Sequence, residues 1–165
     1  MVTAVTSAYD VAAATPDPEL PVVTIGDLGI LRDITQTQGR TVVTITPTYS
    51  GCPAMREIGA DITRRLARAG YGDVEVRTAL APAWSTDWIT DEGRRKLADA
   101  GIAPPAPAGR RTGPIPLTLG RPAGPACPRC GSPRTRRDAE FGATACKSLH
   151  RCDDCAEPFE AVKPL

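Results

Sequence analysis

Five of the six cysteines in this 165-residue chain lie in its last 39 residues, and four of these form two CxxC pairs. The first pair is Cys127 and Cys130, and the second is Cys152 and Cys155. A CxxC pair makes a tight turn that points two sulfurs at one ion. Four thiolates at this spacing are typical ligands of zinc, with iron as a less favoured occupant. Because so short a tail buries little apolar surface, we expect the ion to supply much of its folding free energy.

Two further residues of the tail leave the ligand set open. Cys146 is a fifth thiol, and His150 is the single histidine of the sequence. Either could replace a CxxC sulfur, although the simpler interpretation buries Cys146 and leaves His150 in solvent. We expect Phe141 and Phe159 to fill the small core. Four thiolate ligands would leave no open coordination position, which argues against zinc-hydrolase chemistry.

The sixth cysteine, Cys52, lies between a predicted strand and a predicted helix. Pro53 suits the first position of a helix, and apolar residues then recur at three- and four-residue steps until Gly70, the expected C-cap. Cys52 would therefore be the N-cap, where the helix dipole favours a thiolate. The alternatives are a reactive or metal-transferring thiolate and a small buried side chain. No histidine in this half can act as its base, which disfavours a papain-like nucleophile.

Three carboxylates precede Cys52 in a segment that prolines hold extended. They are Asp17, Glu19 and Asp27, and the first predicted strand could bring them near Cys52 to form a mixed oxygen and sulfur metal site. Each of them alone is more often a turn or cap residue. Further along, Trp84 and Trp88 flank a polar loop, where they either anchor the last helix to the sheet or form a patch that faces a partner.

The hydrophobic patterns predict an α+β domain over residues 1–102, a small three-stranded sheet covered by helices in the order α-β-β-α-β-α. The expected elements are a helix in 5–15, a strand near 28–34, a turn at 38–39, a strand at 41–46, a helix at 53–69, a strand at 73–80 and a helix that Thr90 caps. Residues 103–126 hold 7 prolines and 4 glycines and are expected to be a linker, in which 115–119 could dock as an edge strand. Residues 127–165 are the predicted zinc ribbon.

Charge and composition exclude some classes of function. The net charge is +1, with 10 basic and 13 acidic residues in 1–100 and 10 and 6 in 101–165. These counts disfavour a strongly basic nucleic-acid binder. The N-terminus is a poor signal peptide, and no apolar run approaches the ~20 residues of a membrane span. We therefore expect a cytoplasmic protein, in which CxxC pairs hold metal more often than they form disulfides.

Several motifs together resemble a known family. DPELPVVTIGDLGI, TPTYSGCPAM and APAWSTDWITDEGRRKLADAGIAPP are similar to the metal–sulfur cluster biosynthesis family, which includes SufT-like proteins. With CPRCGS and FGATACKSLHRCDDCAEPF added, the chain from about Thr15 onward resembles the PaaD-like accessory proteins of phenylacetyl-CoA monooxygenase (1,2-epoxidase) systems.

This resemblance implies a role that the spacing alone does not show. The family's acidic motif falls on Asp17 to Glu19, its DLG motif begins at Asp27, and its cysteine is Cys52. The implied role is that of an accessory factor, not a catalyst, that assembles or repairs iron–sulfur or other iron centres. Its client would be the oxygenase with a di-iron subunit and an iron–sulfur reductase. Cys146 falls in the family's FGxTxCK pattern, which weakens its interpretation as a merely buried thiol.

We therefore expect a structural zinc in the ribbon and transient iron or an iron–sulfur cluster on Cys52 with Asp17, Glu19 or Asp27. The expected partners are epoxidase subunits or the iron–sulfur assembly machinery. Two other classes stay open. One is a thiol redox protein that uses Cys52 or a CxxC pair. The other is a nucleic-acid-binding zinc ribbon, which the small charge of the tail and its few aromatic residues disfavour.

Overall fold

The computed structural model describes residues 7–49, 51–106 and 124–164. The chain forms two compact units, Met1–Trp84 with Trp88–Gly93, and Ser85–Asp87 with Arg94–Leu165. The domain boundaries expected after residues 102 and 126 stay predictions. The expected edge strand at 115–119 lies outside the described residues. No helix of the described part is long and apolar enough to cross a membrane.

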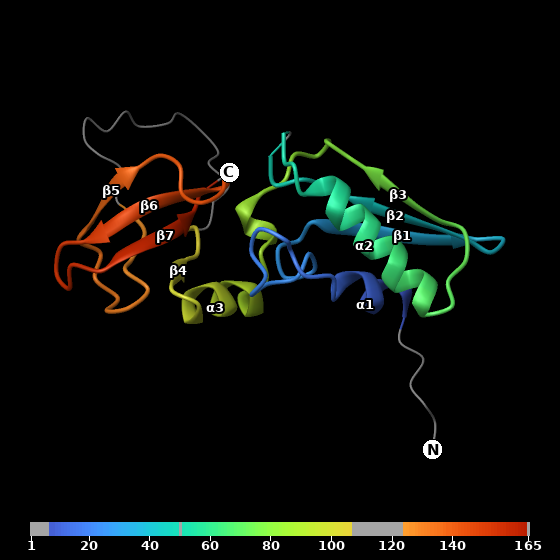
Figure 1. Cartoon of the computed structure of the whole chain (residues 1–165), viewed down its shortest axis with the longest axis horizontal. Coiled ribbons are helices and arrows are strands. Elements are labelled where there is room, and N and C mark those ends of the chain that lie inside the picture. Colours follow the sequence, from blue (N-terminus) through green and yellow to red (C-terminus); the bar gives the residue numbers. More distant parts are fainter. Residues whose placement is uncertain (1–6, 50, 107–123, 165) are drawn as a thin grey trace, which may run out of the picture. The chain divides into compact units, whose positions relative to one another are not determined.

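The first unit contains the expected three-stranded sheet, in the order β1-β2-β3 (Figure 1). β1 (Leu31–Thr37) runs antiparallel to β2 (Arg40–Ile45), and β3 (Val74–Thr78) runs parallel to β2. The turn between β1 and β2 uses two left-handed residues, Gln38 at φ 51° and Gly39 at φ 82°. This pair of conformations matches the right-handed twist of a two-residue hairpin, so the predicted turn is confirmed.

Helices cover the sheet as the hydrophobic pattern predicts. α2 (Met55–Arg68) lies across one face of the sheet in Figure 1, and its buried side chains are Ile58, Ile62 and Leu66. They recur every four residues, so one stripe of the helix can pack on the buried side chains of β2. α1 (Ala8–Ala13) begins with a capping box in which Ser7 and Asp10 bond each other's backbone N–H groups.

The start of α2 differs from the prediction. Ala54 is the N-cap residue and makes no side-chain cap, so the placement of Cys52 at the N-cap is wrong. The Cys52 N–H donates to the Tyr49 carbonyl at 3.1 Å, and a second turn follows before the first helical bond, from Ile58 N to Ala54 O. Because these turns come first, the helix begins three residues after Cys52. At the other end Ala69 is the C-cap, one residue before the predicted Gly70, which follows in the left-handed conformation at φ +90°.

The segment after β3 is hydrogen-bonded to the loop that contains the DLG motif, through Trp84 and Thr90. A 3-10 turn, η1 (Thr86–Trp88), precedes α3 (Asp91–Asp99). Thr90 caps α3 as expected, because its hydroxyl accepts the Gly93 N–H at 3.0 Å. Trp84 is buried and donates to the Leu28 carbonyl, which favours the anchoring alternative and argues against a partner-facing place for this residue. Trp88 is half-buried, with the Arg32 guanidinium 3.5 Å above its ring.

The second unit has a four-stranded sheet in the order β4-β7-β6-β5. Its strands are β4 (Ile102–Ala103), β5 (Thr135–Ala139), β6 (Lys147–Cys152) and β7 (Pro158–Val162). β4 pairs parallel with β7, so a strand precedes the proline-rich segment, which the sequence patterns did not suggest.

The core of this unit confirms one predicted aromatic residue and corrects the other. Phe159 is buried with Ala103, Cys127, Cys152 and Ala161. Phe141 is 63% exposed, so its prediction as a core residue is wrong. Its ring lies beneath the Lys163 ammonium, 3.8 Å from the centroid.

Candidate metal centre and thiol site

The four CxxC sulfurs converge on one point. The ligand atoms of Cys127, Cys130, Cys152 and Cys155 all lie within 4.8 Å of one another. The Cys127 and Cys155 sulfurs are 3.8 Å apart, and those of Cys130 and Cys152 are 3.6 Å apart. A tetrahedral ion with Zn–S bonds of ~2.3 Å requires sulfurs ~3.8 Å apart. The donor set therefore fits one tetrahedral ion such as zinc, which would supply charge and cross-linking rather than an open coordination position.

The two cysteine turns, which we call knuckles, have the same local structure. Cys127 N–H donates to the Ser132 carbonyl, and Cys152 N–H donates to the Glu157 carbonyl, both at 2.9 Å. The residue after the second cysteine is left-handed in both knuckles, with Gly131 at φ 73° and Ala156 at φ 59°. Glycine adopts this conformation without strain, whereas alanine rarely does.

Crowding of the four thiols separates their pKa values when no ion lies between them. The N–H of Cys155 lowers the pKa of the Cys152 thiol below its ordinary 9.0. The N–H of Ser132 also favours the Cys130 thiolate. The neighbouring thiols and burial outweigh it, and raise the pKa of Cys130 to about 12. An ion that binds all four sulfurs must displace these protons, so binding is coupled to proton release.

Cys146 and His150 lie outside this centre. Of the residues that the structure describes, only the four CxxC cysteines form a group of three or more potential ligands. His150 is 7% exposed, so its expected place in solvent is wrong. It stacks on Phe159, and its Nε2 lies 2.9 Å from the Ser148 hydroxyl. Burial, and then the Arg137 charge, lower the pKa of His150, so the imidazole is neutral at pH 7. Cys146 is half-buried, beside the Thr144 hydroxyl at 3.1 Å.

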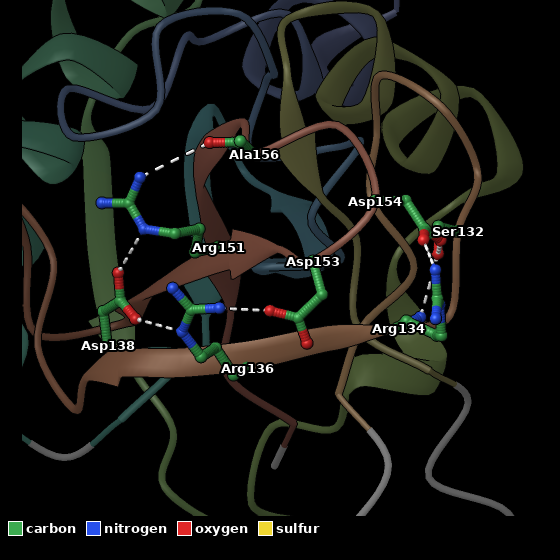
Figure 2. A network of polar contacts seen from close by, with 8 residues as sticks. All are labelled: Ser132, Arg134, Arg136, Asp138, Arg151, Asp153, Asp154 and Ala156. Carbon is green, nitrogen blue, oxygen red and sulfur yellow. Dashed lines mark hydrogen bonds and ion pairs between the residues drawn. The ribbon is translucent and has the colours of Figure 1, made fainter.

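Carboxylates of the same unit pair with the arginines around the knuckles. Figure 2 shows Asp138 between Arg136 of β5 and Arg151 of β6, with Arg136 also bound to Asp153. A separate group joins Asp154 to Ser132 and Arg134. These arginines are therefore neutralised locally, which weakens the case for an open cationic surface of the kind that binds nucleic acid.

In the first unit, two of the three candidate carboxylates organise a loop. Asp17 is buried, and its Oδ1 accepts the N–H groups of Glu19 and Leu20, each at 2.8 Å. Asp27 is also buried, and its Oδ2 accepts the Thr24 N–H at 2.9 Å. Glu19 itself is half-buried. The sequence predicted these residues as potential metal ligands. In the structure both aspartate carboxylates accept backbone N–H groups and so fix the conformation of the loop.

The DLG motif lies against the segment that leads into α3. The Asp27 carbonyl accepts the Thr90 N–H at 2.9 Å. Gly29 has φ +66°, and a Cβ there would lie 2.6 Å from Trp88. A Cβ on Gly93 would lie 2.8 Å from the Asp27 carbonyl oxygen. Both glycines are therefore needed for close backbone approach, and they hold the motif in one place.

Cys52 lies half-buried in the turn that precedes α2. In residues 7–49, 51–106 and 124–164, the four ribbon cysteines are the one group of three or more potential metal ligands, and this group does not include Cys52 or the three carboxylates. The assignment of Asp17, Glu19 and Asp27 as its companions stays a prediction.

The fold and the four converging sulfurs define a small α+β domain joined to a four-cysteine ribbon, and family models match both parts. Residues 14–78 match the family model described as "Iron-sulfur cluster assembly protein". Residues 112–163 match the model described as "PaaD zinc beta ribbon domain". A crystal structure of a domain of unknown function, DUF59, from Bacillus anthracis is 30% identical, with a TM-score of 0.52 over 55% of this chain and 87% of that one. A conserved hypothetical protein of Thermotoga maritima is 26% identical, with a TM-score of 0.47 over 58% of this chain and 94% of that one.

One relative covers nearly the whole chain. A protein of Escherichia coli (strain K12), provisionally described as one of the subunits of 1,2-phenylacetyl-CoA epoxidase, is 45% identical over 148 residues. The match spans 90% of this chain and 86% of that protein. The chain therefore belongs to the PaaD family.

Proposed function

We propose that this protein is a non-catalytic accessory factor of a phenylacetyl-CoA epoxidase and helps to assemble or repair its iron centres. The observation that carries the proposal is the extent of the likeness to the Escherichia coli epoxidase component, which includes both the assembly-type domain and the ribbon. Either domain alone would support only a general role. Their union in one chain points to an assembly factor dedicated to one oxygenase.

In this proposal Cys52 binds iron or an iron–sulfur cluster as cargo. A site that must release its cargo cannot be a closed cage, and a half-buried thiol in a turn suits such transfer. Asp17 and Asp27 hold the neighbouring loop through the backbone N–H groups they accept. The remaining ligands would come from Glu19, one of these carboxylates, or the client protein.

The ribbon would have a different part in the same task. Its four sulfurs fit a structural zinc, which would stabilise a surface that docks on epoxidase subunits or on the iron–sulfur assembly machinery. Such work belongs in the cytoplasm, where thiols stay reduced. One zinc bound by all four thiols would also exclude the alternative in which a CxxC pair carries out redox chemistry.

The test compares iron loading of the epoxidase in cells that carry the wild-type protein, Cys52→Ser or Cys146→Ser. We expect Cys52→Ser to lower the iron content of the purified oxygenase and growth on phenylacetate, with zinc in the accessory protein unchanged. Cys146→Ser also removes one half-buried thiol, so the comparison shows whether a loss of iron is specific to Cys52. Normal iron loading with Cys52→Ser would overturn the role of Cys52. Normal loading without the whole protein would overturn the proposed function.

A further inference from the structure

The two knuckles are linked to each other by their own side chains in a reciprocal way. Arg129 lies two residues after the first cysteine of its knuckle, and it pairs with Glu157, five residues after the first cysteine of the other. Asp154 lies two residues after Cys152, and it accepts a hydrogen bond from Ser132, five residues after Cys127. In each knuckle, the residue two positions after the first cysteine thus bonds the residue five positions after the first cysteine of the other knuckle.

The second knuckle has further bonds on its two middle residues. Figure 2 shows Asp154 beside both Ser132 and Arg134, and Asp153 beside Arg136. The Asp153 N–H also donates to the Arg134 carbonyl at 2.9 Å. Both residues between Cys152 and Cys155 are therefore fixed to the chain that follows the first knuckle.

We propose that this set of bonds, the cross-knuckle clasp of Arg129–Glu157 and Asp154–Ser132–Arg134, sets how tightly the four-cysteine centre holds its ion. Cys130 and Cys155 are the exposed members of the centre, and each directly follows a clasp residue, Arg129 or Asp154. The clasp keeps these two exposed sulfurs directed toward their buried partners, which lowers the cost of ordering them when the ion binds.

The positive charge of Arg129 also favours tighter binding of the ion by the four-cysteine centre. A divalent ion with four thiolates has a net charge of −2, and a nearby cation reduces their mutual repulsion. Arg129 lies between the two cysteines of the first knuckle, and its guanidinium pairs with Glu157 of the second knuckle. An exposed ion pair alone is worth little, about 0–1 kcal/mol. Groups that hydrogen-bond metal ligands typically change metal affinity by about 10–100-fold, and the clasp would orient Cys130 and Cys155 through the residues next to them in the chain.

The test measures zinc affinity of the full-length protein by competition with a chromophoric chelator. Arg129→Gln and Asp154→Asn are expected to weaken zinc binding by about tenfold and to speed zinc loss. Glu75→Gln is the matched control, because it removes an arginine-paired carboxylate from β3, far along the chain from the knuckles. The charge-transfer bands of the cobalt-substituted protein report whether four thiolates still bind, and they separate weaker binding from a ribbon that fails to fold.

A double-mutant cycle distinguishes a clasp from unrelated local effects. Arg129→Gln with Glu157→Gln should bind zinc no more weakly than the weaker single variant, because both remove the same bond. The conservative Asp154→Glu should retain most of the affinity. Wild-type affinity in both Arg129→Gln and Asp154→Asn would overturn the proposal, and so would strictly additive losses in the cycle. None of these outcomes depends on iron delivery by Cys52, so the two proposals are tested separately.

Discussion

The indole N–H of Trp84 donates a hydrogen bond of 2.8 Å to the carbonyl oxygen of Leu28, 56 residues earlier in the chain. Leu28 is the middle residue of the DLG motif, and both partners are buried. This bond and the close approach of Gly29 to Trp88 hold the motif against the segment that leads into α3. The position of the motif thus depends on a residue that contacts it from a distant part of the sequence.

Trp84→Phe should lower the free energy of unfolding by about 1–2 kcal/mol, because it leaves the buried Leu28 carbonyl without its donor. Urea unfolding followed by far-UV circular dichroism measures this change, and Trp88 remains as a fluorescent reporter. Trp88→Phe, at a half-buried ring, should have a smaller effect. Equal losses in the two variants would contradict a specific role for the Trp84 bond.

Gly29→Ala should be more damaging than Gly39→Ala, although both glycines have positive φ. At Gly39 a Cβ would meet nothing within 4 Å, so the loss is the conformational strain of about 1 kcal/mol. At Gly29 the same strain is joined by a Cβ placed 2.6 Å from Trp88, and the total should reach about 3 kcal/mol. Chemical denaturation gives the loss in free energy of unfolding for each variant. Similar losses would contradict the prediction, because they would show that the loop at Gly29 shifts to accommodate the Cβ.

Ala156→Gly should stabilise the zinc-loaded chain by about 0.5–1 kcal/mol, because glycine adopts a φ of 59° without strain. Gly131→Ala is the reverse change at the equivalent position of the first knuckle, where a Cβ would meet nothing within 4 Å. It should destabilise by about 1 kcal/mol. Thermal unfolding at fixed zinc concentration gives both values, and effects of the same sign would contradict the equivalence of the knuckles.

Asp61 should make stability depend on pH. Burial opposes its ionisation, but Arg65 and Arg64, each with a nitrogen 3.0 Å from the carboxylate, hold the pKa of Asp61 below its ordinary 3.8. Because the pKa is lower in the folded state, the stabilisation is present above pH ~4 and is lost as the pH falls through the folded-state value. A carbon NMR titration of this carboxyl should show a low midpoint that rises in Arg65→Gln. In the control Arg95→Gln the midpoint should stay unchanged.

The repeating features of the sequence predicted most of the structure. Apolar spacing placed α2 and β2, and the paired CxxC motifs identified the four sulfurs that converge in the ribbon. The N-cap at Thr90 followed from its residue type and the acidic residues after it. These signals are local, so one sequence is enough to read them.

Features that depend on tertiary packing were missed. The start of α2 was misplaced because turns around Tyr49 and Cys52 delay the helix, and Pro53 alone cannot reveal them. His150 is buried because it lies on the inner face of β6 and stacks on Phe159, a contact that its lone occurrence in a polar tail does not suggest. The reciprocal links between the knuckles had a weak signal, the opposite charges of Arg129 and Asp154 at equivalent positions.

The short strand β4 is part of the ribbon's sheet, so the ribbon extends further toward the N-terminus than its cysteine motifs suggest. Ile102 and Ala103 pair with Glu160 and Ala161 of β7, and Ala103 is 1% exposed. The family model for the ribbon begins at residue 112, after this strand. A fragment excised at that boundary would keep all four sulfurs but uncover one side of β7, with its unpaired backbone groups open to self-association. An autonomous ribbon should therefore be cut before residue 102.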